Sequence, residues 1–74
     1  MSEVKNSTMI RLTLDKALEK RNISRYELAK RTGIQYQIID NYYKNKVKRY
    51  HSYVIDRICD ALNCNISELI EYIK

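Results

Sequence analysis

Proline is absent from this chain, and glycine occurs only once, at Gly33. Proline breaks helices and glycine weakens them, so the usual interruptions of helical structure are missing. Apolar residues recur with a period of about 3.6 in most segments, as they do on one face of an α-helix. The 74 residues permit one domain, and we expect its fold to be all-α.

The sequence also contains no apolar run long enough to span a bilayer, and no signal peptide or lipidation motif. We therefore expect a cytoplasmic protein that makes no contact with a membrane. Its net charge of +5 and sequence pI near 9.3 favour an anionic partner, with ordinary solubility as the alternative explanation.

The residues that metal centres, disulfides and active sites need are scarce. Two cysteines, Cys59 and Cys64, cannot complete a zinc site, and the one histidine, His51, lies apart from them in sequence. A reducing compartment disfavours a disulfide, so we interpret both cysteines as small buried hydrophobic residues. There is no nucleophile–base pair, no glycine-rich phosphate loop and no separate effector domain. We expect neither an enzyme, nor a cofactor, nor a small-molecule ligand.

The most informative segment surrounds the single glycine. Ser24 is a suitable N-cap, and Glu27 stands three residues later, where its carboxylate can close a capping box. Gly33 suits the left-handed end of this first helix, and a second helix runs from Gln35 to about Lys44. Ala29 leaves room for two helices to cross closely. The pattern predicts a helix-turn-helix.

The rest of the chain divides around this motif. Residues 1–8 are polar and unpatterned, and we expect a flexible tail before a domain over residues 9–74. Residues 9–14 alternate in polarity, which allows a short strand. Further helices are predicted over 14–21, with Asn22 as a left-handed stop, and over 52–62.

A fifth helix is predicted at the C-terminal end. Asn65 is a candidate N-cap, and Glu68 can complete a second capping box. Its apolar residues are Ile66, Leu69, Ile70 and Ile73.

The helix-turn-helix segment resembles a known family. Ala29, Gly33 and Ile39, with Leu28 and Ile34 beside them, are similar to the DNA-binding core of the phage repressor and Cro family of bacterial regulators. The similarity extends over about residues 9–72 and concerns the small stand-alone members. It implies a five-helix, lambda-repressor-like domain that acts as a transcriptional regulator, most often a repressor, on double-stranded DNA.

The resemblance assigns base reading to the helix after the glycine. Ile34, Ile39 and Tyr42 supply its inward face. Asp40 is expected outward with an ion pair to Lys44, and the alternatives are that it accepts from a cytosine amino group or repels phosphate. Amides such as those of Gln37 and Asn41 bond adenine bidentately, whereas the alternative is that they are solvated surface groups. The expected base-reading residues are Tyr36, Gln37, Ile38 and Asn41.

Phosphate binding is assigned to residues that flank this helix. Four cations fall within six residues over 44–49, with a solvated loop as the alternative explanation. The expected backbone contacts are Ser24, Arg25, Gln35, Tyr43, Lys44, Lys46, Lys48, Arg49 and Tyr50. Three other tyrosines, Tyr26, Tyr53 and Tyr72, are expected to be half-buried packing residues.

One such module reads only a few base pairs, so we expect a homodimer on a palindromic operator. Its interface is either the fifth helix or the 9–14 segment, although both can instead close the monomer core. A different function on the same scaffold is a protein-interaction module, such as an antitoxin or an inhibitor encoded on a mobile element. Tyr36, Ile38 and Tyr43 suit either kind of contact.

Overall fold

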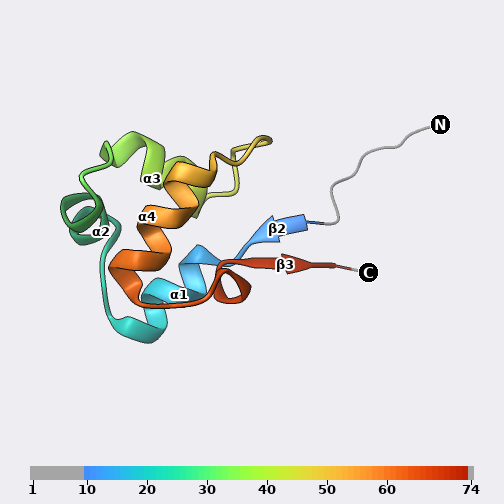
Figure 1. Ribbon diagram of the computed structural model, residues 1–74, viewed down its shortest axis with the longest axis horizontal. Helices are drawn as coiled ribbons and strands as arrows, with labels where there is room; N and C mark the ends of the chain where they lie inside the picture. The colour runs from blue at the N-terminus through green and yellow to red at the C-terminus, as the bar shows by residue number, and fades with distance from the viewer. Residues whose placement is uncertain (1–9, 74) are drawn as a thin grey trace.

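A computed structural model describes residues 10–73, so the expected tail over residues 1–8 lies outside the described part. Four α-helices form the body, and two short strands extend from one side of it (Figure 1). The elements in chain order are β2 (Ile10–Leu12), α1 (Leu14–Arg21), α2 (Arg25–Thr32), α3 (Tyr36–Tyr43), α4 (Ser52–Leu62), the 3-10 turn η1 (Ile66–Glu68) and β3 (Ile70–Tyr72). None of the helices in this part is long and apolar enough to cross a membrane.

The helices end where the capping residues predicted that they would. Asn22 (φ 55°) and Gly33 (φ 74°) both adopt the left-handed conformation at helix C-termini. The Ser24 hydroxyl accepts a hydrogen bond of 3.0 Å from the Glu27 N–H. The reciprocal half of the predicted capping box is not formed, because the Glu27 carboxylate pairs with Arg31 one turn later at 2.9 Å.

The predicted fifth helix is wrong. Only the single turn η1 forms, and the chain then enters β3, which pairs antiparallel with β2 in the register Ile10 with Tyr72 and Leu12 with Ile70. The Asn65 side chain makes no capping bond. The backbone groups that a helix would bond internally bond the N-terminal strand instead, beginning with Thr13 N–H donating to the Leu69 carbonyl at 2.7 Å. The strand expected over 9–14 is therefore real, and its partner is the C-terminal segment.

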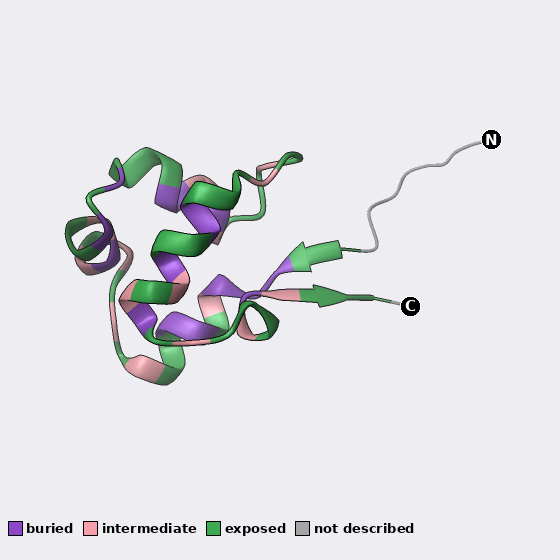
Figure 2. Ribbon diagram, in the orientation of Figure 1, coloured by how far each residue is buried: buried purple, intermediate pink, exposed green. Residues whose placement is uncertain are grey.

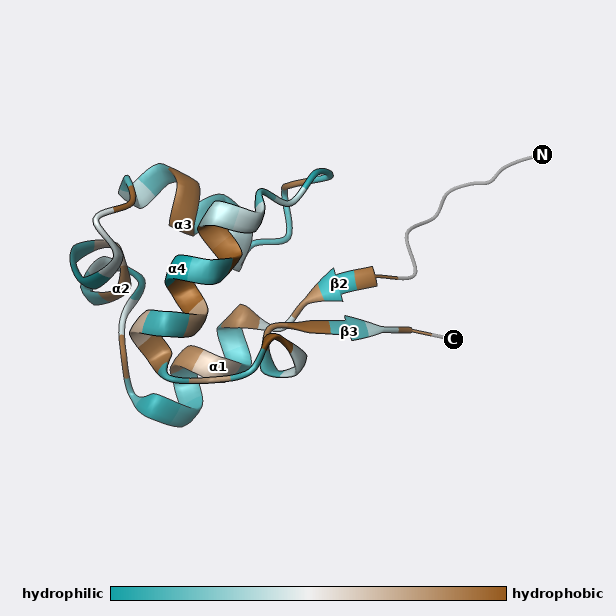
Figure 3. Ribbon diagram, viewed as in Figure 1, coloured by the Kyte–Doolittle hydropathy of each residue, from teal (hydrophilic) through white to brown (hydrophobic). Residues whose placement is uncertain are grey.

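Apolar faces of all four helices close a single core. In Figures 2 and 3 buried, hydrophobic residues alternate with exposed, polar residues along α4. This alternation is that of a helix with one apolar side and one polar side. The most buried large side chains are Leu12, Leu14, Leu28, Ile39, Tyr42, Ile58 and Leu69.

Two expectations about side-chain burial fail. Cys59 and Cys64 pack against the core but are only half-buried. Tyr26, Tyr53 and Tyr72 were expected to be half-buried, yet they are 72%, 61% and 65% exposed. None of these three rings packs against the core; Tyr26 contacts the partly exposed ring of Tyr36, and Arg57 lies over the ring of Tyr53.

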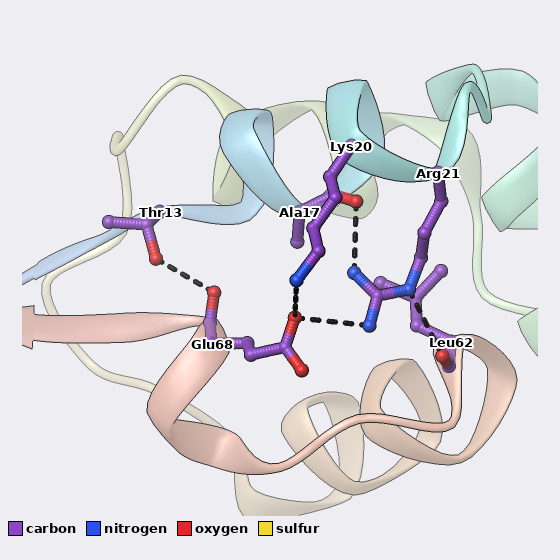
Figure 4. A network of polar contacts seen from close by, with 6 residues as sticks. All are labelled: Thr13, Ala17, Lys20, Arg21, Leu62 and Glu68. Carbon is purple, nitrogen blue, oxygen red and sulfur yellow. Dashed lines mark hydrogen bonds and ion pairs between the residues drawn. The ribbon is translucent and has the colours of Figure 1, made fainter.

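Arg21 joins the ends of three elements (Figure 4). Its guanidinium donates to the Ala17 carbonyl at 3.1 Å, to the Leu62 carbonyl at 3.1 Å and to the Glu68 carboxylate at 3.0 Å. The Thr13 hydroxyl donates to the Glu68 carbonyl at 2.9 Å. A cation thus binds a carbonyl within α1 and the last carbonyl of α4, and it anchors η1 to both helices through Glu68.

Arg21→Met is expected to lower the free energy of unfolding by about 2 kcal/mol, because partly buried carbonyls and a carboxylate lose a charged donor. Lys20→Met is the matched control. Lys20 reaches the same carboxylate at 3.8 Å, but its side chain is 72% exposed, so we expect a loss below about 0.5 kcal/mol. Urea denaturation followed by circular dichroism measures both values. Equal losses in the two variants would contradict the anchoring role of Arg21.

Candidate nucleic-acid interface

The turn between α2 and α3 is fixed by more than its glycine. The buried Thr32 hydroxyl donates to the Leu28 carbonyl at 2.9 Å and accepts from the Ile34 N–H at 3.2 Å. From α4, Arg57 donates to the Thr32 carbonyl at 3.1 Å. A Cβ on Gly33 would meet only ordinary contact, so its positive φ is what favours glycine there. These bonds hold the two helices at one crossing, and no simple sequence pattern points to Arg57.

The outward face of α3 presents the predicted polar residues. Ile39 and Tyr42 are 0% and 2% exposed and turn inward, as expected. Gln37 is exposed and donates through Nε2 to the Asn41 Oδ1 at 3.1 Å. This bond orders both amides while leaving the Gln37 carbonyl oxygen and both N–H groups of Asn41 available to a ligand.

Apolar side chains border these amides. Tyr36 is 41% exposed and Ile38 is 37% exposed, both large enough to contact a base or a methyl group. The ring of Tyr26, from α2, lies 6.1 Å from that of Tyr36. The pair extends the exposed surface of α3 onto α2.

Asp40 is not on the outward face, which corrects the expectation for that residue. It is 8% exposed and lies between two cations, with Arg25 Nη1 at 2.6 Å and Lys44 Nζ at 3.1 Å. The expected ion pair to Lys44 is therefore confirmed, but a second cation from α2 draws the carboxylate inward. Burial alone would raise the pKa of Asp40, yet hydrogen bonds and charge from Lys44 and Arg25 hold it below its ordinary value.

Arg25 has an internal role at this site. Besides its ion pair with Asp40, its guanidinium lies 4.4 Å from the centre of the Tyr43 ring. The side chain remains 34% exposed, so part of it still faces solvent. Arg25 and Tyr43, both predicted as phosphate contacts, thus meet each other across the α2–α3 junction.

The basic segment after α3 is held in place by Asn45. Asn45, just after the C-cap Lys44, has φ 59° and so adopts the left-handed conformation, which asparagine tolerates well. Its side-chain amide then pairs with the backbone of Leu12, accepting from the N–H at 2.7 Å and donating to the carbonyl at 2.9 Å. The amide takes the place of a neighbouring strand, so β2 and the end of α3 are tied together.

The remaining predicted phosphate contacts lie around α3. Lys46, Lys48 and Arg49 are exposed, and Lys44 is 47% exposed although paired with Asp40. The others are Ser24, exposed at the start of α2, Gln35, exposed at the start of α3, and Tyr50, half-buried against Tyr42. These residues are thus exposed or half-buried at the start of α2, at the start of α3 and in the segment that follows α3.

The N-terminus of α4 was not among the predicted site residues. Its first residue follows His51, which supplies no side-chain cap and whose N–H donates to the Tyr42 hydroxyl at 2.9 Å. His51 and Tyr53 share a shallow groove with Gln35 and Ile38. A helix end with N–H groups directed outward therefore lies beside the start of α3. In the sequence, this helix end is indicated only by His51 and Ser52, which precede the apolar residues of α4.

Comparison with known proteins is consistent with this arrangement. A family model described as the Cro/C1-type HTH DNA-binding domain matches residues 13–74. The crystal structure of the transcriptional regulator VanUg (Form II) is similar, with a TM-score of 0.70 and 25% sequence identity over 97% of each chain. No curated protein matches the sequence.

Asp40→Asn is expected to remove part of the acid sensitivity of folding. Because the folded-state pKa of Asp40 lies below its ordinary value of 3.8, the carboxylate stabilises the fold fully above that value. The contribution is lost as the pH falls through the folded-state pKa. The stability difference between wild type and variant should therefore be largest near neutral pH and shrink below about pH 4.

Urea denaturation at a series of pH values measures this difference. Asp56→Asn, at an exposed position of α4, is the control and should keep the acid dependence of the wild type. A gap between wild type and Asp40→Asn that stays constant across the series would show that charge on Asp40 is not what stabilises the junction.

Proposed function

Since the chain belongs to the Cro/C1-type helix-turn-helix DNA-binding family, we propose that it is a sequence-specific regulator that inserts α3 into the major groove. The observation that carries this proposal is the ordered amide pair of Gln37 and Asn41 on the exposed face of α3. Amide groups match the N6 and N7 edge of adenine, and each good pair discriminates between bases by about 1–3 kcal/mol. Ile38 and Tyr36 then contact thymine methyl groups or neighbouring sugars.

Phosphate contacts flank the groove in this proposal. Lys46, Lys48 and Arg49 bind one strand from the segment after α3. The N-terminal ends of α2 and α4 bind phosphates through backbone N–H groups, with Ser24 and His51 nearby. Arg25 contributes the exposed part of its side chain, while its ion pair with Asp40 keeps α2 aligned with α3.

We further propose that the protein acts as a homodimer on a palindromic operator and represses transcription by occluding a promoter. One copy of α3 spans only a few base pairs, so two copies are needed for useful specificity. The two segments expected to form the interface pair with each other within the monomer. They nevertheless leave Ile10 43% exposed and Ile73 39% exposed beside a two-stranded sheet in which no further strand pairs with β3 within residues 10–73. Such a sheet is marginal alone and gains from a second copy. A DNA-bound regulator of this kind works in the cytoplasm, at the nucleoid.

The alternative is a protein-binding module that uses the same face. Tyr26, Tyr36 and Ile38 are large and exposed, and the first two rings contact each other, as in many protein interfaces. An antitoxin or an inhibitor of a mobile element would use this surface without reading bases. Selection of bound duplexes from random DNA, at a stated salt concentration, separates the two functions. A regulator enriches an inverted repeat, whereas a protein-binding module enriches nothing.

Gln37→Ala and Lys48→Ala are expected to weaken DNA binding in different ways. Gln37→Ala should relax the preference at one or two base positions by about 1–3 kcal/mol, because a base-edge contact is lost. Lys48→Ala should weaken binding to all sequences alike and reduce the slope of log K against log salt by about 1. Fluorescence anisotropy on single-base operator variants at several salt concentrations measures both effects. Indistinguishable profiles for the two variants would refute the division into reading and anchoring residues.

The dimer predicts a strict dependence on half-site spacing. Two half-sites whose centres lie about one helical turn apart, 10–10.5 base pairs, should be bound together on one face of the duplex. Insertion of about five base pairs turns one half-site to the opposite face and should abolish cooperative binding. Electrophoretic mobility shift with the two duplexes measures this. Equal affinity for both duplexes would contradict a rigid dimer.

A further inference from the structure

The corner that follows α4 brings the two cysteines together. Asn63 is left-handed with φ 53°, its N–H donates to the Asp60 carbonyl at 3.3 Å, and the Cys64 N–H donates to the Cys59 carbonyl at 3.0 Å. This bond pattern is a Schellman motif, in which the side chains at the positions of Cys59 and Cys64 normally form the accompanying apolar contact. Here both members of that contact are thiols.

Both cysteines are free and half-buried. They line one open hollow together with acidic and amide side chains, namely Asp56, Asp60, Asn63, Asn65 and Glu68. No group of three or more potential metal ligands exists among residues 10–73, so the pair lacks the further ligands that a closed zinc site needs. Two adjacent thiols without a metal are instead suited to two-electron oxidation.

We propose that Cys59 and Cys64 form a reversible oxidation site that an uncharged hydroperoxide converts to an intramolecular disulfide. The acidic rim of the hollow repels anionic oxidants such as glutathione disulfide, which leaves small neutral peroxides as the reactive class. The proposal concerns a surface of α4 and η1 and does not depend on the DNA-binding role of α3.

The two thiols differ in their surroundings, and this difference assigns their roles. Burial raises the pKa of the Cys59 thiol, and the neighbouring Cys64 thiol and carboxylates raise it further. Because these surroundings disfavour the Cys59 thiolate, Cys59 suits the resolving position, and the first attack falls to Cys64, in the turn after α4.

The chemistry balances with a peroxide as the only oxidant. The Cys64 thiolate attacks one peroxide oxygen, the O–O bond breaks, and the leaving oxygen departs as alcohol or water with the proton that the thiol gave up. Cys64 is then a sulfenic acid. The Cys59 sulfur then attacks the sulfur of this sulfenic acid and displaces the hydroxyl group on Cys64. The S–S bond forms, and the hydroxyl group leaves as water with the Cys59 proton. Two thiols have lost two electrons to one peroxide.

Hydrogen peroxide applied to the full chain, with free thiols and peptide masses measured over time, tests the proposal. Both cysteines lie on one tryptic peptide, Ile58–Lys74, because cleavage follows Arg57 and no other lysine or arginine intervenes. We expect that peptide to lose two hydrogen atoms in mass, both thiols to disappear together, and dithiothreitol to restore them. Intermolecular dimers, or sulfinic acid without the loss of two hydrogens, would overturn the proposal.

Single variants test the two roles. Cys59→Ser should accumulate a sulfenic acid on Cys64 that dimedone traps, whereas Cys64→Ser should react with peroxide roughly tenfold more slowly. Equal rates in the two variants would overturn the assignment of attacking and resolving thiols. Circular dichroism of both variants shows whether the fold is kept, and DNA affinity measured alongside distinguishes failure of this site from failure of the proposed function.

Discussion

Asp40, held between Arg25 and Lys44, joins the first turn of α2 to the body of α3. The orientation of α3 depends on this contact, because the outward residues of the helix can enter a groove only if its inward face stays fixed against α2. The hydrogen bonds of Thr32 at the turn, and the bond from Arg57 to the Thr32 carbonyl, also hold α3 against α2. A charged contact at one end of α2 and a buried hydroxyl at the other therefore hold the two helices at one angle.

The strands extend this support to the other end of α3. Asn45 bonds the backbone of Leu12, and β2 in turn pairs with β3. The Thr13 N–H, just before α1, donates to the Leu69 carbonyl, just before β3. The basic segment consequently leaves α3 from a fixed point. A surface that recognises DNA needs this, because phosphate contacts set the register in which base contacts are made.

Local sequence signals predicted the parts of the fold that local interactions determine. Ser24, Gly33 and Asn22 mark helix ends through their own hydrogen bonds and dihedral angles, and all three have these roles. The C-terminal segment was mispredicted because its apolar residues fit a helix and a strand equally well. The strand forms because the segment bonds the backbone of residues 10–13, which lie far away in sequence. The spacing of apolar residues within the segment carries no information about that partner.

The site shows the same division between local and distant effects. The inward positions of Ile39 and Tyr42 follow from spacing on one helix and are confirmed. The burial of Asp40 is decided by Arg25 on another helix, and the bond from Arg57 comes from a helix later in the chain. Side-chain roles that depend on a partner far away in sequence could not be predicted from spacing alone.

The most direct test of the account is NMR titration of the protein with a duplex recovered by selection. The side-chain amide resonances of Gln37 and Asn41 should shift most, together with the backbone amides of α3 and of residues 46–49. Resonances of β2 and β3 should change only through dimer contacts. Shifts confined to the strands, with the Gln37 and Asn41 amides unchanged, would contradict the claim that the outward face of α3 reads DNA.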